Sequence, residues 1–292
     1  SRQLPANGEH KLDVPSQTWI EDSMAQPVYV GLDMGASRTK VAVIDRHGAL
    51  LGYAVKKSGT DFATTAALCL ETSLKLAGAQ QSDIVNAIAT GYGRKNVAFV
   101  TDKSKTEIGC HAKGCHYSFP EAITIIDIGG QDNKIIKLGA DGRRDSFKMN
   151  RKCAAGTGAF LEEMSSRLDI PLDEMNSLAR QATEMIKLGS YCTVFSATEV
   201  LENIRHGKPV ADIIKGIFYS MIQRVLEMDA LTEKVVLSGG VVAHNPYLVE
   251  MTAELIGRPV LLPEFPQLTG AHGAALYALD EATASAASNK DV

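Results

Sequence analysis

Two short segments of the chain combine an aspartate with glycine and with hydroxyl or amide side chains, a pattern that suits phosphate binding. They lie at 33–40 and 127–134. A glycine lets backbone N–H groups approach a phosphate closely, and an aspartate at the end of a strand can hold the hydrated magnesium ion of a nucleotide. We therefore expect Asp33 and Asp127 to act on the metal of one bound nucleotide, although either segment alone could be a plain glycine turn between two strands.

The first segment offers backbone N–H groups, hydroxyls and one ammonium as candidate contacts to phosphate oxygens. These candidates are Gly35, Ala36, Ser37, Thr39 and Lys40. In the second segment, Gly129 and Gly130 expose backbone N–H groups, and Gln131 could orient the attacking water as a glutamine does in other NTP hydrolases. Two such turns in a duplicated fold can face each other across a cleft and clamp one polyphosphate.

A third glycine-containing segment follows at 235–245. Gly239 and Gly240 would let an adenosine lie against bare backbone, and Asn245 is a further candidate contact. The sequence contains neither a P-loop of the GxxxxGK[ST] type nor a GxGxxG motif after a strand. The three segments in this order predict a site for ATP with Mg2+ that is assembled from separate parts of the chain.

Two of the five cysteines stand between the second and third segments. Cys153 precedes a helical pattern that begins near residue 159, and Cys192 precedes one that begins near residue 196. A helix N-terminus stabilises a thiolate, and two thiolates are half of a four-cysteine iron–sulfur site. A complete cluster would then need a second subunit, while two buried, inert thiols are the open alternative.

The elements that must position these groups form two similar units. An apolar strand that ends in aspartate and leads through glycine to lysine occurs at 30–40 and again at 125–134, and such an echo is typical of a duplicated domain. Hydrophobic periodicity predicts the strands of the first unit at 28–33, 40–45, 50–55 and 84–90, with a helix at 64–77. In the second unit it predicts strands within 122–138 and at 234–237, and helices at 159–168, 171–188, 197–205 and 210–228 and from residues 246 and 270.

The domain organisation follows from these units and from the composition of the ends. We expect a disordered N-terminal tail at 1–26, with Met24 as a candidate native start, and a first lobe at 27–120. A second lobe at 121–280 would carry the two cysteines, followed by a C-terminal tail at 281–292.

The bulk composition excludes several classes of protein. The chain has 292 residues, of which 45% are hydrophobic and 6% aromatic, which is ordinary for a globular protein. A formal net charge of −4 argues against a nucleic-acid partner, and no apolar run reaches the roughly 18 residues of a membrane span. Five cysteines are too few for a disulfide framework, and the N-terminus lacks an apolar signal core, so we expect a cytoplasmic protein.

The three nucleotide segments together resemble the phosphate-1, phosphate-2 and adenosine motifs of the sugar kinase, Hsp70 and actin superfamily. The matching residues are 31–40, 125–134 and 235–245. This resemblance implies an α/β fold, namely a duplicated actin-like (ribonuclease H-like) ATPase with two lobes and the nucleotide cleft between them.

The cysteine segments make the resemblance more specific. Residues 152–158, KCAAGTG, and residues 192–195, CTVF, are similar to those of BadF/BcrA-type ATPases, which are activators of 2-hydroxyacyl-CoA dehydratases and ATPase subunits of benzoyl-CoA reductase. The similarity covers roughly residues 28–280. It implies that Cys153 and Cys192 bind one [4Fe–4S] cluster per dimer, shared between two subunits, and that ATP hydrolysis drives a low-potential electron into a partner enzyme.

The same resemblance implies three kinds of partner. These are a second copy or a paralogous ATPase subunit, a CoA-thioester dehydratase or reductase component, and reduced ferredoxin or flavodoxin as the electron donor. Arg151, Ala159 and Ala197 depart from the family pattern, in which Asp, Arg and Glu respectively are common. All three flank the cysteine segments, where charge tunes potential and docking, so the particular partner stays open.

Two other functions are compatible with the nucleotide motifs. A carbohydrate kinase of the same fold would need an aspartate base near an acceptor hydroxyl, and an ATP-binding sensor would transfer no electrons. A zinc site at 110–116, where Cys110 and Cys115 stand beside histidines, is disfavoured because a second ligand pair at zinc-finger spacing is missing. The acidic pairs at 162–163 and 173–174 are interpreted as solvated helix faces.

Overall fold

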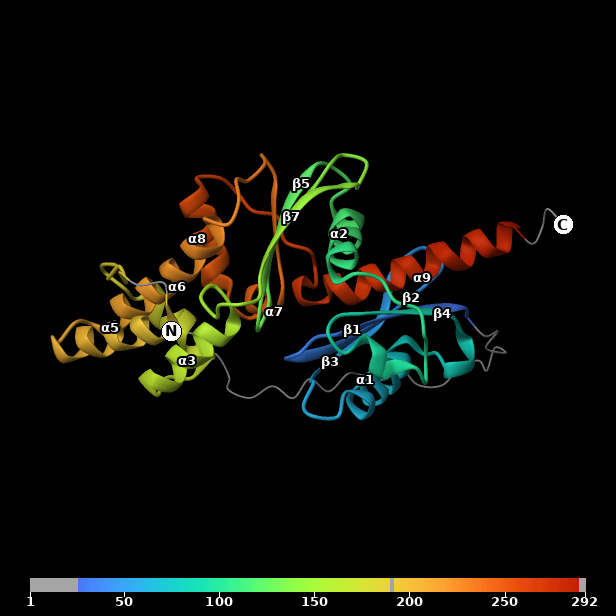
Figure 1. Ribbon diagram of the computed structural model, residues 1–292, viewed down its shortest axis with the longest axis horizontal. Coiled ribbons are helices and arrows are strands. Elements are labelled where there is room, and N and C mark those ends of the chain that lie inside the picture. The colour runs from blue at the N-terminus through green and yellow to red at the C-terminus, as the bar shows by residue number, and fades with distance from the viewer. Residues whose placement is uncertain (1–25, 190–191, 289–292) are drawn as a thin grey trace, which may run out of the picture.

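Each half of the chain builds a four-stranded sheet around a buried central strand (Figure 1). The computed structural model describes residues 26–189 and 192–288. The first sheet has the order β3-β2-β1-β4 and the second the order β7-β6-β5-β8. The strands of the first sheet are β1 (Val28–Met34), β2 (Arg38–Ile44), β3 (Leu50–Lys57) and β4 (Ile84–Thr90). Those of the second are β5 (Ile123–Ile128), β6 (Asn133–Leu138), β7 (Arg144–Asn150) and β8 (Val235–Ser238).

The two sheets are built to the same plan, as expected from the repeated motif. In each, a central strand pairs antiparallel with the next strand in sequence and parallel with a later one. The register places Asp33 opposite Lys40 in the first sheet and Asp127 opposite Lys134 in the second. The duplication therefore brings equivalent aspartate–lysine pairs to the same end of each sheet.

Helices cover both faces of the first sheet. Helix α1 (Phe62–Ala77) packs on one face, and α9 (Thr269–Ser288) packs on the other. Along β1 the side chains alternate between the two faces, so Val30 and Leu32 join the core under α1 whereas Tyr29 joins the core under α9. This alternation decides which side chains near the end of β1 can reach the space between the lobes.

The second sheet is likewise covered on both faces. Helix α2 (Glu107–Ser118) lies over Ile125 and Ile136, and the opposite face, with Ile126 and Ile135, joins a large helical core. The helices of this second lobe are α3 (Gly158–Leu168), α4 (Leu172–Arg180), α5 (Thr193–Arg205), α6 (Val210–Leu226), α7 (Gly240–His244) and α8 (Pro246–Ile256). The described chain also contains short 3-10 turns, namely η1 (Gln81–Asp83), η2 (Arg94–Val97) and η3 (Pro266–Leu268).

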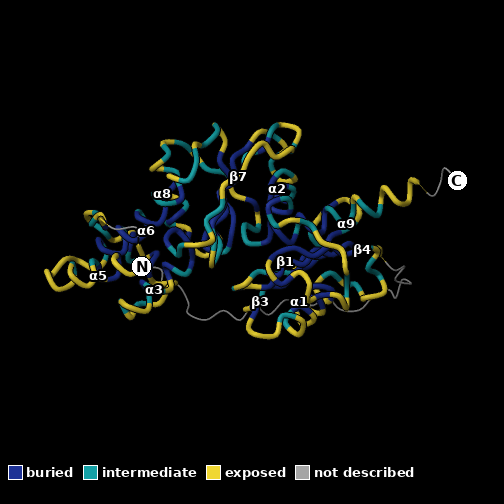
Figure 2. The backbone as a smooth tube through the Cα atoms, viewed as in Figure 1, coloured by how far each residue is buried: buried dark blue, intermediate teal, exposed yellow. Residues whose placement is uncertain are grey.

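Helices α2 and α9 cross where the two lobes meet, and they touch through glycines. A Cβ built on Gly273 would lie 1.8 Å from the carbonyl oxygen of Cys110, and one on Gly114 would lie 2.2 Å from that of Thr269. A side chain at either position would force the helices apart. Figure 2 shows buried backbone through the central strands of the sheets, and exposed backbone along the edge strand β7 (Arg144–Asn150) and at the far end of α9.

Several elements differ from the sequence expectation. The helix expected at 171–188 ends at Arg180, because the backbone N–H groups of Thr183 and Glu184 instead donate to the buried carboxylate of Asp212. Strand β7 was not expected, since it is a largely exposed edge strand of mostly polar residues.

The C-terminal end of the described chain is helical. Residues 281–288, expected as part of a tail, continue helix α9, and this helix packs on the first sheet although it follows the second lobe in sequence. Residues 1–25 of the expected N-terminal tail lie outside the described residues. Within the described part of the chain, no helix is long and apolar enough to span a membrane.

Candidate functional site

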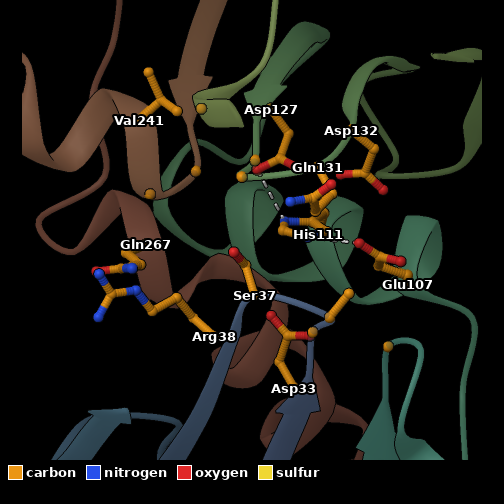
Figure 3. A pocket seen from close by; sticks show the side chains of 18 of the residues that line it. Asp33, Ser37, Arg38, Glu107, His111, Asp127, Gln131, Asp132, Val241 and Gln267 are labelled. Atoms are coloured by element: carbon orange, nitrogen blue, oxygen red, sulfur yellow. Dashed lines mark ion pairs between the residues drawn. The ribbon is translucent and has the colours of Figure 1, made fainter. Parts of the chain in front are cut away.

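A cleft of about 1380 Å3 separates the two lobes and is lined by all three glycine-containing segments (Figure 3). Of the residues predicted to contact the nucleotide or its metal, the following line it: Asp33, Gly35, Ala36, Ser37, Lys40, Asp127, Gly129, Gly130, Gln131, Gly239, Gly240 and Asn245. The structure thus brings together residues that are far apart in sequence, from Asp33 to Asn245.

The first and second turns face each other at contact distance. A Cβ built on Gly130 would lie 2.9 Å from Ser37 Oγ and 3.0 Å from Ser37 Cβ, so only a glycine fits without moving one of the turns. Figure 3 shows Ser37 and Gln131 entering the cleft from opposite lobes. The two turns therefore border the same part of the cleft, and the backbone N–H of Gly129 already donates to the Asp132 carbonyl at 2.9 Å within its own turn.

Thr39 is the predicted contact that the structure does not bring into the cleft. It pairs with Met34, and both side chains lie on the α1 face of the sheet. Its hydroxyl is fully buried, 3.0 Å from Ser58 Oγ. Lys40, the next residue, points to the opposite face, as strand alternation requires, and its Nζ lies 2.9 Å from Asp33 Oδ2.

The lysine of each turn neutralises the aspartate opposite it. Burial by itself would lower the pKa of Lys40, but the Asp33 carboxylate offsets this and raises that pKa above its ordinary value. Lys134 Nζ lies 3.0 Å from Asp127 Oδ2 in the second lobe. Its pKa is likewise raised, because the nearby carboxylates outweigh the effect of burial.

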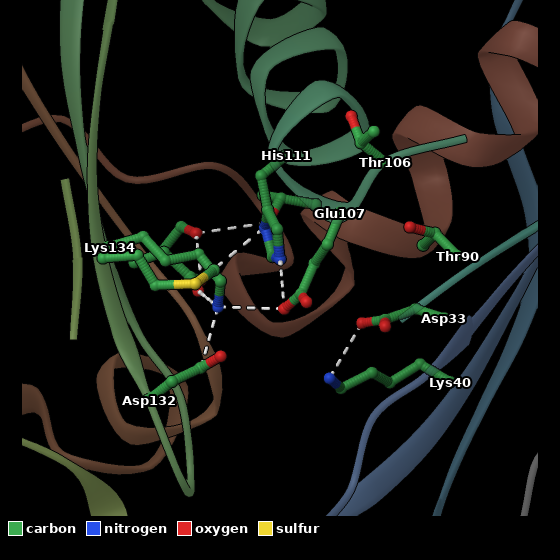
Figure 4. Close-up of polar contacts among 12 residues, drawn as sticks. Asp33, Lys40, Thr90, Thr106, Glu107, His111, Asp132 and Lys134 are labelled. Atoms are coloured by element: carbon green, nitrogen blue, oxygen red, sulfur yellow. Dashed lines mark hydrogen bonds and ion pairs between the residues drawn. The ribbon is translucent and has the colours of Figure 1, made fainter. Parts of the chain in front are cut away.

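Lys134 is more enclosed than Lys40 and meets more negative charge (Figure 4). Only 1% of its surface is exposed. Besides Asp127, its ammonium contacts Asp132 Oδ1 at 2.8 Å and Glu107 Oε1 at 2.9 Å. Three carboxylates, from strand β5, the turn after it and helix α2, thus share one buried cation.

Asp127 is held ionised by its surroundings. Burial would raise its pKa, but the ring of His111 and the ammonium of Lys134 hold the pKa well below its ordinary value. Ser238 donates a hydrogen bond to Asp127 Oδ1 at 2.8 Å, and His111 Nδ1 lies 3.6 Å from the same oxygen. Thr269 Oγ1 lies 2.9 Å from His111 Nδ1, which ties the ring to the start of α9. A charged carboxylate at this position can bind a hydrated metal ion.

The side of the cleft predicted to hold adenosine is formed by the third segment. Gly239 has a φ of 102°, and a Cβ there would lie 2.3 Å from the carbonyl oxygen of Ile128, so the position requires glycine. Asn245 lines the cleft, but its side chain donates to the Val241 carbonyl and accepts from Asn176. It therefore shapes the wall of the cleft through two hydrogen bonds inside the protein.

Several residues that line the cleft carry no sequence motif. Glu107 and His111 lie four residues apart on α2, and Arg38 and Gln267 also line the cleft. Glu162 and Asp173, interpreted from sequence as solvated helix faces, line it as well while remaining exposed. No motif marks these residues, because tertiary packing of α2, α3 and α4 decides which of their faces borders the cleft.

The cysteines divide into two groups by exposure. Cys153 is half-buried, and Cys192 is exposed at the N-cap of α5. The other three cysteines are buried, and burial raises the pKa of the Cys110 thiol to about 12 and raises those of Cys69 and Cys115 as well. Only the first two therefore combine accessibility with a position near a helix start.

The described residues contain no group of three or more His, Cys, Asp or Glu side chains arranged to hold a metal ion. Cys153 precedes α3 and Cys192 begins α5, and these two helices pack against each other. Two accessible thiols are half of the four that a cysteine-ligated iron–sulfur cluster needs. Cys110 and Cys115 both lie in the buried part of α2.

Comparison with known proteins places this geometry among nucleotide-binding ATPases. Residues 30–278 match the family model described as the BadF/BadG/BcrA/BcrD ATPase family. The chain is 40% identical over 256 residues to the activator of lactoyl-CoA dehydratase from Anaerotignum propionicum, covering 87% of this chain and 98% of that protein.

Solved structures give the same result. The activator of the 2-hydroxyisocaproyl-CoA dehydratase from Clostridium difficile, with bound ADPNP, superposes with a TM-score of 0.82 at 37% identity, covering 91% of this chain and 98% of that one. A ROK family glucokinase from Streptomyces griseus has a TM-score of 0.53 at 12% identity over 87% of this chain and 99% of that one, a likeness of fold alone. The duplicated actin-like ATPase fold expected from the sequence is confirmed.

Proposed function

Because the chain belongs to the BadF/BadG/BcrA/BcrD ATPase family, we propose that it is an ATPase that activates a 2-hydroxyacyl-CoA dehydratase, or a partner like benzoyl-CoA reductase, by transferring electrons to it. The observation that carries the nucleotide half of this proposal is the contact between the two glycine turns at Ser37 and Gly130. It makes the cleft a clamp for one polyphosphate, with an aspartate–lysine pair on each side.

Hydrolysis would use groups from both lobes. Asp33 and Asp127 would hold the hydrated Mg2+ of ATP, and Lys40 would meet phosphate oxygens from the first turn. Gln131 is exposed in the cleft and can orient the attacking water. The energy of hydrolysis would bias one arrangement of the subunits over another, so that the useful output is conformational.

Cys153 and Cys192 would supply two ligands of a [4Fe–4S] cluster, and a second copy or a paralogous ATPase subunit would supply the other two. Such a cluster, when bound, carries single electrons at a low potential. The accessibility of these two thiols, in contrast to the three buried ones, supports this assignment. We further propose a cytoplasmic protein that receives its electrons from reduced ferredoxin or flavodoxin.

The first test is the iron content and visible absorption of protein purified without oxygen, beside Cys153→Ala. Cys110→Ala is the matched control, because it removes a buried thiol of the same chain. We expect a brown protein with about four irons per dimer, a loss of iron in Cys153→Ala, and retention of iron in the control. An iron-free parent that still hydrolyses ATP after anaerobic cluster reconstitution would contradict electron transfer. Sugar-dependent ATP consumption would then identify a kinase, and its absence would favour a sensor.

A further inference from the structure

The loop that carries Cys153 is held at its start by one side chain. Asn150 ends strand β7, and its Nδ2 donates to the carbonyl oxygen of Cys153 at 2.9 Å. Its Oδ1 accepts from the backbone N–H of Cys153 at 3.2 Å. Both backbone polar groups of Cys153 are therefore bonded to a single amide, which fixes the cysteine relative to the end of the strand.

A second asparagine holds the far end of the same loop. Asn133 begins strand β6 and lies directly opposite Asn150 in the antiparallel register. Its Nδ2 donates to the carbonyl oxygen of Gly156 at 2.9 Å. Gly156 has a φ of 81°, and a Cβ there would lie 2.7 Å from Asn133 Nδ2, so the loop fits against this amide only as glycine.

The second asparagine also borders the nucleotide turn. Asn133 directly follows residues 129–132, and the same turn holds the start of α3. Gly158 donates from its backbone N–H to the Gly129 carbonyl at 2.9 Å, and Ala159 donates to the Gly130 carbonyl at 2.8 Å. The cysteine loop is thus bonded at both of its ends to the strands and the turn that line the second half of the cleft.

The burial of Asn133 argues that its amide has a specific task. The residue is fully buried, and among the described residues its Oδ1 has no hydrogen-bond partner. Burying an unsatisfied acceptor costs free energy, so an apolar side chain of similar size would fill the same space at lower cost. What an apolar residue could not supply is the hydrogen bond from Nδ2 to the cysteine loop.

We infer that Asn133 and Asn150 are positioning residues that couple the nucleotide turn to the Cys153 loop, so that the occupant of the turn sets the accessibility of the Cys153 thiol. The inference rests on the proposed binding of ATP in the cleft. Two linked sites influence each other only through contacts that differ between their states, and the bonds of these two amides are contacts that join the strands beside the turn to the cysteine loop. Loss of either amide therefore loosens the loop and uncouples it from the cleft.

The test measures the reactivity of the Cys153 thiol directly and does not require a bound cluster. In the full-length Cys192→Ser chain, Cys153 is the thiol among the described residues that still reaches the surface. The rate of its modification by N-ethylmaleimide is followed by peptide mass spectrometry without nucleotide, with Mg-ADP and with Mg-ADPNP. Binding of ADPNP is measured separately by calorimetry on each variant.

We expect the rate at Cys153 to differ about fivefold between ADP and ADPNP, the lower end of typical coupling between sites. Asn150→Ala should raise the rate without nucleotide by about fivefold, the equivalent of one net hydrogen bond, and remove the difference between nucleotides. Asn133→Ala should do the same. Asn150→Asp, which keeps the acceptor and loses the donor, should fall between the parent and Asn150→Ala.

Asn86→Ala is the matched control, because it removes an amide that donates to the Ala278 carbonyl at 2.9 Å in the other lobe. It should leave both the rate and its dependence on nucleotide as in the parent. A parent that binds ADPNP without any change at Cys153, or asparagine variants with parental rates, would overturn the coupling. Failure of the parent to bind ADPNP would instead overturn the proposed function, and the inference with it.

Discussion

Lys134 lies opposite Asp127 across the antiparallel strands β6 and β5, with its Nζ 3.0 Å from Asp127 Oδ2. Lys40 and Asp33 have the same relationship in the first lobe, at 2.9 Å. Each pair stands where a glycine turn joins two strands, so the duplicated chain places one buried ion pair on each side of the cleft. The second pair differs in that Lys134 also forms ion pairs with the carboxylates of Glu107 and Asp132.

Lys134→Met should destabilise the protein strongly, because it leaves a buried carboxylate without its cation. Removing one partner of a buried ion pair costs about 3–5 kcal/mol of unfolding free energy. Lys137→Met is the matched control on the same strand, since Lys137 pairs with Asp229 at 3.1 Å in a partly exposed position. A partly exposed pair contributes about 0–1 kcal/mol. Urea unfolding of both variants at neutral pH measures the difference, and equal losses would contradict the proposed role of burial.

The pH dependence of stability should also change in Lys134→Met. The pKa of Asp127 is lowered in the folded protein, so the stability it contributes is present above the unfolded value of about 3.9 and is lost as the pH falls below it. Without Lys134 this pKa rises toward the unfolded value, so the profile should shift to a smaller loss of stability at acid pH than in the parent. The pKa of Lys134 is raised, so its contribution is present below about 10.4 and is lost as the pH rises through its folded value. Unfolding free energies from pH 3 to pH 9 would show the shift at the acid end.

Gln131→Ala should lower the kcat of ATP hydrolysis while leaving the fold intact. Its side chain is exposed in the cleft, so its removal should change the unfolding free energy by no more than about 0.5 kcal/mol. Losing a group that orients the attacking water should reduce kcat by about 100-fold. Gln267→Ala, beside Gly240 on the side proposed to hold adenosine, should raise KM with little change in kcat. Steady-state kinetics of both variants test the assignment, which fails if Gln131→Ala changes KM alone.

Gly130→Ala should weaken nucleotide binding by separating the two turns. The new Cβ would lie 2.9 Å from Ser37 Oγ and 3.0 Å from Ser37 Cβ, and relieving such overpacking typically costs about 1–3 kcal/mol. Calorimetry with ADPNP measures the loss. The same substitution in a Ser37→Gly background should cost less, because both clashing atoms are gone, and a double-mutant cycle isolates this term. Additive losses would mean that the turns do not meet as described.

The placement of the residues predicted to bind nucleotide around one cleft was largely predictable, because the pattern that predicts them is concentrated in local motifs. Asp33 and Asp127 each follow an apolar strand and precede a glycine turn, and this pattern places them correctly at the ends of β1 and β5. The family expected from the cysteine segments is confirmed as well. Thr39 does not reach the cleft, because strand alternation directs its side chain under α1 while Lys40 enters the cleft, and residue type alone does not show this.

What the sequence could not predict depends on contacts between distant elements. His111 and Glu107 reach the cleft because α2 packs both on the second sheet and on α9. Its close contact with α9 depends on glycines such as Gly273, which are distant from α2 in sequence. The opposition of Asn133 and Asn150 depends on the register of β7, a largely exposed, mostly polar edge strand without a clear hydrophobic period.

Gly273→Ala sets helix propensity against packing, and the two effects have opposite signs. In a helix interior alanine is favoured over glycine by about 1 kcal/mol, which alone would stabilise α9. The new Cβ, however, would lie 1.8 Å from the carbonyl oxygen of Cys110 in α2. Backbone cannot rotate away as a side chain can, so the helices must separate at a cost of about 1–3 kcal/mol.

Packing should prevail, so we expect Gly273→Ala to lower the unfolding free energy and to weaken ADPNP binding by changing how the lobes meet. Gly109→Ala, on α2 itself, is the matched control, because the nearest atoms to its new Cβ are side-chain atoms of Thr106 and Tyr277 at 3.0 and 3.5 Å. It should be neutral or stabilising. Thermal unfolding of both variants measures the change in stability, and calorimetry with ADPNP measures the change in nucleotide affinity. A stabilised Gly273→Ala protein with parental ADPNP affinity would show that the lobes do not depend on this close helix crossing.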